Sequence, residues 1–133
     1  MTKNTFHCSI ITPERVLLEC EARFVAFPAH DGEVGILPHR APLVYKLGVG
    51  PLRVEMDGET LLFLVDGGFA QMADNRLAIL TQHAQKASEV NVAEAEKAYL
   101  AARNMRINDD QSHETRTRAI QRAQTQLRLA RSR

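Results

Sequence analysis

Pro28-Ala29-His30-Asp31-Gly32-Glu33-Val34-Gly35-Ile36-Leu37-Pro38-His39-Arg40-Ala41-Pro42-Leu43 is the stretch that shapes this chain. It contains three of the five prolines and two of the seven glycines. Proline fixes φ and glycine permits positive φ, so their alternation specifies one backbone path. Val34, Ile36 and Leu37 are apolar, which predicts a short strand within a rigid loop. Such a loop is typical of a docking surface, although two tight turns around one strand explain the composition equally well.

Short segments with strand periodicity recur on both sides of this stretch. Phe6 to Ile10 alternates apolar and polar residues, and Leu61 to Val65 is an apolar run suited to a strand covered on both faces. Asp57-Gly58 is a hairpin-turn signal. The other expected strands are 16–18, 22–27, 34–37, 43–47, 52–56, 69–72 and 77–80, with a break at 48–51. The pattern predicts an all-β N-terminal domain, an antiparallel β-sandwich over residues 1–84.

The composition changes after about Gln82, and residues 81–133 contain no glycine or proline. Asn91 followed by Glu94 resembles a capping box, and Ser112 is placed to cap a second helix after a polar turn at 108–111. Apolar residues then recur at helical spacing in two stripes, Val92, Ala95, Tyr99, Ala102 and Met105, then Ile120, Ala123, Leu127 and Ala130. We expect an α-helical hairpin over residues 88–133.

Alanine-rich stripes bury little area, so we expect these helices to dock only conditionally. Residues 116–133 also carry six arginines and no acidic residue, although the whole chain has a net charge of only +1. The bland interpretation is a solvated basic face, and the functional one is a mobile arm that seeks an acidic surface. The arginines of this tail are Arg116, Arg118, Arg122, Arg128, Arg131 and Arg133.

Sequence motifs for catalysis and for nucleotide phosphates are missing. The chain has no GxxxxGK(S/T), GxGxxG or GxSxG pattern, and no nucleophile accompanies His30, Asp31 and His39. Cys8 and Cys20 do not form a CxxC pair, which argues against a metal site. Cys8 alternates with apolar residues and is expected in the core, and a disulfide to Cys20 stays open. No cofactor is expected.

Other partner classes are disfavoured by composition. The chain lacks Trp and has few aromatic residues, so no stacking platform for nucleic acid is expected. The N-terminus shows no signal-peptide core, and no apolar run approaches the roughly 20 residues that span a bilayer. We therefore expect a cytoplasmic protein that contacts a membrane only through a partner.

The order of sandwich and helical hairpin resembles the epsilon subunit family of F-type ATP synthases, relatives of the mitochondrial delta subunit. Residues 32–38 with 41–43 are similar to the family's GExGILP…HAPL signature. Residues 47–54 are similar to its LxxGxLxI pattern, and Gly67-Gly68-Phe69 with residues 77–80 and Ala84 to its GGFxxV…VTILAxxA pattern. Three ordered motifs at matching spacing make the resemblance specific, and it extends over essentially the whole chain.

The resemblance implies a non-catalytic rotor subunit of the proton-translocating F1Fo ATP synthase, in which the central stalk couples the gamma subunit to the c-ring. It implies a c-ring contact at His30, Asp31, Gly32 and Glu33, and a gamma contact at Pro38, His39, Arg40, Ala41, Pro42 and Leu43. The helical hairpin would inhibit ATP hydrolysis by meeting the alpha and beta subunits with Arg116, Arg118, Arg122, Arg128 and Arg131. The expected location is the cytoplasmic face of the inner membrane, peripherally bound.

Two positions depart from the family pattern. Arg40 stands where the family has the His before Ala-Pro-Leu, and His39 precedes it. Some members bind ATP through an I/L-D-x-x-R-A motif, where this chain has Asn91 for the Asp and Glu94 for the Arg. A carboxylate in place of a guanidinium repels phosphate, so we expect weak or no ATP binding.

Two alternatives stay open from the residues alone. One is a free-standing β-sandwich module whose arginine-rich helical tail contacts RNA or anionic lipid. The other is a small hydrolase that uses His30 and Asp31.

Overall fold

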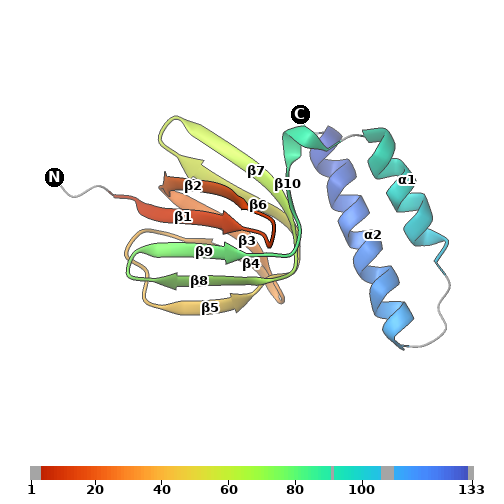
Figure 1. Cartoon of the computed structure of the whole chain (residues 1–133), viewed down its shortest axis with the longest axis horizontal. Helices are drawn as coiled ribbons and strands as arrows, with labels where there is room; N and C mark the ends of the chain where they lie inside the picture. The colour runs from red at the N-terminus through yellow and green to blue at the C-terminus, as the bar shows by residue number, and fades with distance from the viewer. Residues whose placement is uncertain (1–3, 91, 106–109, 132–133) are drawn as a thin grey trace.

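The computed structural model describes residues 4–90, 92–105 and 110–131. Two five-stranded sheets face each other as a β-sandwich, and two helices lie at one end of it (Figure 1). The first sheet has the order β2-β1-β9-β8-β5, formed by β1 (Phe6–Ile11), β2 (Val16–Ala22), β5 (Leu43–Lys46), β8 (Phe69–Ala73) and β9 (Arg76–Leu80). The second has the order β10-β7-β6-β3-β4, formed by β3 (Phe24–Ala29), β4 (Gly32–Ile36), β6 (Val49–Met56), β7 (Glu59–Asp66) and β10 (Ala84–Lys86).

The core lies between the sheets and follows from the alternation in the strands. Phe6, Cys8 and Ile10 of β1 point inward and are fully buried, as are Phe27 of β3 and Phe63 of β7. A fully buried side chain of this size contributes about 1.5–3 kcal/mol, so these positions hold the two sheets together. The expected sandwich and the core position of Cys8 are confirmed.

The sandwich is not wholly antiparallel, contrary to the sequence-based expectation. β1 pairs in parallel with β9, with Cys8 opposite Leu77 and Ile10 opposite Ile79. These are the first and last strands of their sheet in chain order, and the intervening chain traverses the whole sandwich. A connection of that length leaves the direction of pairing free, so no local turn signal could reveal it.

The expected break at residues 48–51 is also wrong, because β6 already begins at Val49 and contains Pro51. Proline is tolerated there because the β3–β6 ladder stops at Ala26 opposite Arg53. β7 alone continues beside this part of β6, with Pro51 opposite Leu64.

Two turns match their sequence signals. Asp57-Gly58 joins β6 to β7, and Gly58 has φ of 77°. Asp74 and Asn75 have φ of 52° and 59° between β8 and β9. These left-handed conformations suit Gly, Asn and Asp, which explains why the turns were readable from sequence.

The helical hairpin consists of α1 (Val92–Arg103) and α2 (Asp110–Arg131), and a 3-10 turn, η1 (Ala87–Glu89), precedes it. The hairpin is confirmed, but Ser112 does not cap the second helix, which already includes Asp110. The expected cap Asn91 and most of the expected polar turn at 108–111 lie outside the described residues.

Helix α2 lies between the sandwich and α1 (Figure 1). Ala123 is buried, as the stripe predicted, whereas Thr125 and Leu129 are buried without having been predicted. Leu129 packs on Leu64 of β7 and Ala87 of η1. Because Leu64 is out of phase with core residue Phe63, α2 covers the outer face of the second sheet here. The strand expected at residues 61–65 is therefore covered on both faces only toward its end, from Phe63 to Val65, whereas Leu62 is exposed.

Candidate functional site

The tip of the β3–β4 hairpin holds His30, Asp31, Gly32 and Glu33, and all four are exposed. Ala29 pairs with Gly32, so His30 and Asp31 form the turn, and Gly32 has φ of 140°. The His30 amide donates to the Lys46 carbonyl at 3.1 Å, and that of Gly48 donates to the Pro28 carbonyl at 2.9 Å. The sandwich therefore presents Glu33 and its neighbours on a tethered polar tip.

The loop from β4 to β5 carries Pro38, His39, Arg40, Ala41 and Pro42 and crosses from the second sheet to the first. His39 has φ of 64°, and its amide donates to Asn75 Oδ1 at 2.7 Å. Asn75 in turn donates from Nδ2 to the Thr5 carbonyl at 2.9 Å. This loop is thus fastened to the turn between β8 and β9.

The two expected contact sets lie at opposite ends of β4. β4 is five residues long, which corresponds to about 16 Å of backbone from end to end. The His30 end faces α2 across an open hollow of about 600 Å³, lined in part by Lys46, His113 and Arg118. The structure therefore places His39 away from His30 and Asp31 and offers two separate surfaces.

The outer face of the first sheet carries an apolar surface that sequence reasoning missed. Phe69, Leu80 and Val44 are 52%, 42% and 65% exposed. Phe69 of β8 pairs with Leu80 of β9, and Leu80 pairs with Ile11 of β1. Phe69, Leu80 and Ile11 therefore form one row across three strands. An apolar-walled hollow of about 460 Å³ opens beside Phe69 and Leu80. We call Val44, Phe69 and Leu80 the apolar surface.

A signal for this surface is present in the sequence. In β8, Ala70 and Met72 are buried, so Phe69 points to the opposite, outer face. In β9, Leu77 and Ile79 are buried, so Leu80 points to the outer face as well. Both strands are therefore apolar in the outward phase at one end. Exposed apolar side chains that lie side by side on a protein surface are typical of an interaction site.

The arginines of α2 find their acidic partner in the sandwich. Arg118 Nε lies 3.2 Å from Asp66 Oδ1, and Arg122 Nε lies 2.7 Å from Asp66 Oδ2. The Asp66 side chain is 6% exposed, whereas those of Arg118 and Arg122 are 55% and 42% exposed. Among the described residues, neither Asp66 Oδ1 nor Arg122 Nε has a hydrogen-bond partner. The two ion pairs to Asp66, together with the packing of Leu129 on Leu64, join α2 to β7.

The remaining arginines differ from these two. Arg116 donates from Nη2 to the Arg103 carbonyl at 3.1 Å, at the end of α1, where a cation is favourable. Arg128 is exposed, and the side chain of Arg131 lies outside the described part of the chain.

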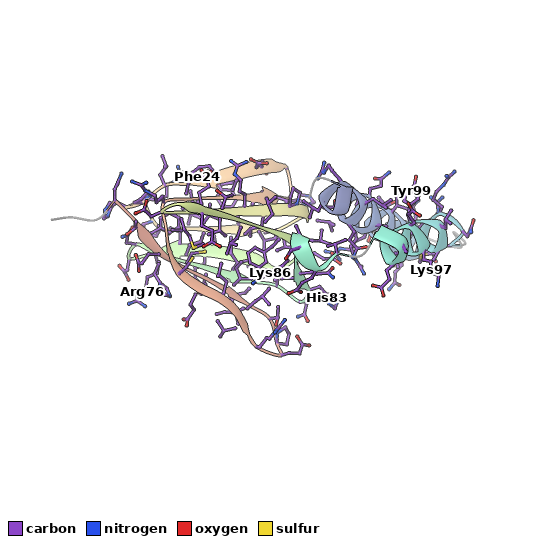
Figure 2. All side chains as sticks on the ribbon, turned by 90° about the horizontal axis from the view of Figure 1, so that it is seen from above. Phe24, Arg76, His83, Lys86, Lys97 and Tyr99 are labelled. Atoms are coloured by element: carbon purple, nitrogen blue, oxygen red, sulfur yellow. The ribbon has the colours of Figure 1, made fainter. Side chains whose placement is uncertain are left out.

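The expected ATP motif lies where α1 begins, and Asn91 is outside the described residues. Glu94 is exposed in the first turn of α1. Figure 2 shows His83 and Lys86 where the sandwich leads into the helices, and Lys97 and Tyr99 on α1. Within residues 4–90, 92–105 and 110–131, no group of three or more His, Cys, Asp or Glu side chains could hold a metal. Over the same residues, no helix is long and apolar enough to cross a bilayer.

Comparison with known proteins gives a family match over the sandwich and relatives that are similar along nearly the whole chain. Residues 5–87 match the family model described as ATP synthase, Delta/Epsilon chain, beta-sandwich domain. The chain is 37% identical over 127 residues to the ATP synthase epsilon chain of Rhodopirellula baltica, covering 96% of this chain and 99% of that one. It is 42% identical over 98 residues to that of Desulforudis audaxviator, covering 74% and 72%.

Two solved structures share the fold. A chain of the Euglena gracilis mitochondrial ATP synthase matches with a TM-score of 0.80 at 22% identity, covering 94% of this chain and 81% of that one. A chain of the Tetrahymena thermophila mitochondrial ATP synthase, from a structure of its central stalk and c-ring, matches with a TM-score of 0.74 at 17% identity, covering 98% and 99%. On the sandwich match and the identity along nearly its full length, this chain belongs to the ATP synthase delta/epsilon chain family.

Proposed function

We propose that this chain is a rotor subunit that couples gamma to the c-ring in the central stalk of a proton-translocating F1Fo ATP synthase. As a family member it is a non-catalytic subunit of ATP synthase, which displaces the hydrolase and free-standing-module alternatives. Its place would be peripheral, at the cytoplasmic face of the inner membrane. The observation that carries the proposal is a sandwich with open docking surfaces, on which α2 of the helical hairpin packs against β6 and β7.

The c-ring contact is proposed at the β3–β4 tip. His30, Asp31, Gly32 and Glu33 are exposed, and backbone hydrogen bonds from His30 and Gly48 hold the hairpin in place. A preorganised polar tip loses little conformational entropy on binding, which suits a contact with polar loops.

The gamma contact is proposed at the loop from Pro38 to Leu43 together with the apolar surface. Leu37, 61% exposed, and Val44 flank this loop, so apolar area continues from it. Aromatic and aliphatic side chains dominate the binding energy of protein interfaces, which gives Phe69 the role of an anchor.

Co-purification with gamma tests this surface. Phe69→Ser should weaken binding of gamma by about fivefold or more, since truncation of an anchor costs over about 1 kcal/mol. The matched control is Leu62→Ser, because Leu62 is also exposed, at 37%, but lies on the second sheet. Equal binding by both variants and the native chain would remove the apolar surface from the gamma contact.

The helical hairpin is proposed as a regulatory arm that inhibits ATP hydrolysis. Arg118 and Arg122 are bound to Asp66 in the docked position, and both remain about half exposed. In the inhibitory position, these arginines would pair with acidic groups of the catalytic subunits in place of Asp66. Because each arginine would keep an ion pair with a carboxylate, the free-energy difference between the two positions would be small. Arg116, Arg128 and Arg131 would join that contact.

Truncation after Ala87 in the assembled enzyme tests whether the sandwich binds gamma and the helical hairpin inhibits ATP hydrolysis. The shortened chain should still bind gamma, since the sandwich is retained, and ATPase activity should rise because the arm is missing. Loss of gamma binding would show that the sandwich alone is not the docking unit. Unchanged ATPase activity would show that the arm does not inhibit.

A further inference from the structure

The two cysteines of the chain lie directly opposite each other on neighbouring strands. Cys8 of β1 pairs with Cys20 of β2 in an antiparallel register, and both are free thiols. Both face the interior, since the adjacent inward pairs are Phe6 with Ala22 and Ile10 with Leu18. Directly opposite residues in such a pair have Cα atoms about 4.5–5.5 Å apart, within the range of about 4.4–6.8 Å that disulfides span. The spacing of the two strands therefore lies in the range that a disulfide requires.

The two thiols are chemically unequal. A hydrogen bond between them, together with burial, raises the pKa of Cys8, whereas the same hydrogen bond lowers the pKa of Cys20. Cys8 is fully buried, while Cys20 is partly exposed on β2, an edge strand. Since the thiolate is the nucleophile, Cys20 is the sulfur that an external disulfide meets first, and Cys8 is the sulfur behind it.

We propose that Cys8 and Cys20 form a reversible internal disulfide by exchange with glutathione disulfide. The Cys20 thiolate attacks one sulfur of glutathione disulfide, and the S–S bond breaks to release one glutathione. Cys8 then gives up its proton and attacks Cys20 Sγ, which releases the second glutathione. The two cysteines lose two electrons, glutathione disulfide gains them, and the two thiol protons end on the two glutathiones.

The bond would strengthen the sandwich without changing its docking surfaces. β1 is the neighbour of edge strand β2 in the sheet, so the disulfide would fasten that strand covalently. Neither cysteine belongs to the β3–β4 tip or to the apolar surface. The modification is therefore a site for control of stability, separate from the proposed binding of gamma and the c-ring.

The test incubates the reduced full chain in glutathione buffers of increasing oxidised fraction, followed by acid quench and mass measurement. The native chain should lose the mass of two hydrogens, stay monomeric and yield a peptide pair that joins Cys8 to Cys20. Dithiothreitol should reverse the change. The oxidised chain should also unfold at a temperature higher by about 5 °C or more.

Single variants separate the two roles. Cys8→Ser should accumulate a glutathione adduct on Cys20, because no second thiol resolves it. Cys20→Ser should stay unmodified while folded, because Cys8 is buried. A native chain that keeps glutathione adducts, forms only intermolecular bonds or stays reduced would overturn the proposal. The native-chain result decides even where a variant fails to fold.

Discussion

Asp66 ends β7 with its carboxylate almost fully buried between the sandwich and α2. A buried carboxylate is costly unless cations surround it, and Arg118 and Arg122 supply them one helical turn apart. These arginines have no acidic neighbour in residues 116–133 of the sequence, so the tail looks unpaired when taken alone. The ion pairs of the docked helix thus depend on one residue that the sequence places 52 positions before Arg118.

Asp66→Asn is expected to loosen α2 while the sandwich stays folded. The charge attraction is lost, at a cost of about 1 kcal/mol, because both arginines are half exposed and screened by water. Hydrogen exchange of α2 amides should become about fivefold faster. Asp57→Asn is the control, since Asp57 is 94% exposed beside Arg23 and is remote from α2. Equal exchange in both variants would show that Asp66 does not hold the helix.

Cys20 is expected to react with iodoacetamide at lower pH than an ordinary thiol, because the hydrogen bond from Cys8 lowers the pKa of Cys20 from its ordinary value. A lowered pKa leaves more thiolate at neutral pH, so the rate should reach its plateau earlier as pH rises. Cys8→Ala removes the donor and should shift the rate profile of Cys20 to higher pH. Cys8→Ser keeps a hydroxyl donor and should retain most of the early profile. A profile unaffected by Cys8→Ala would contradict this account.

At the scale of elements, alternation predicted nearly every strand, and its failures have local causes. Pro51 is tolerated in a strand because only β7 pairs with this part of β6, so the N–H that proline lacks is not needed by a second neighbouring strand. β10 is three residues long and was not predicted, since Ala84-Gln85-Lys86 has no apolar periodicity and forms only by pairing with β7. On α2, Leu127 of the predicted stripe packs against Ala95 of α1. Thr125 and Leu129 are buried by a neighbour that periodicity within the helix does not reveal.

The turn between β7 and β8 should tolerate no side chain at Gly68. Its φ is 107°, and an added Cβ would collide with the Leu80 carbonyl oxygen. Gly68→Ala should therefore destabilise the chain by about 2 kcal/mol or more, measured by denaturant unfolding. Gly58→Ala is the matched control, because Gly58 has φ of 77° with nothing within 4 Å of an added Cβ. Its cost should stay near 1 kcal/mol, from backbone strain alone. An equal loss of unfolding free energy in Gly68→Ala and Gly58→Ala would show that no collision occurs at Gly68.

For the whole molecule, the full chain is expected to bind ATP weakly or not at all. Glu94 puts a negative charge in the first turn of α1, at the position where ATP-binding relatives carry an arginine, and so repels phosphate. Isothermal titration calorimetry on the full chain should give no heat at micromolar ATP. Glu94→Arg should raise the affinity for ATP, because it replaces the repelling carboxylate with a guanidinium. A micromolar dissociation constant for the native chain would contradict the prediction.

The sequence by itself determined the sandwich, the helical hairpin, their order and the rigid tip around Glu33, because periodicity, turn residues and composition act locally along the chain. Only the tertiary structure decided the parallel pairing of β1 with β9, the meeting of Asp66 with Arg118 and Arg122, and the outward row of Phe69 and Leu80. It also decided that Cys8 lies opposite Cys20. The β1–β9 pairing and the meeting of Asp66 with the two arginines join residues distant in sequence, which no local pattern encodes. The other two features lie in hairpins, and the register that pairs Phe69 with Leu80 and Cys8 with Cys20 is set when the strands pack.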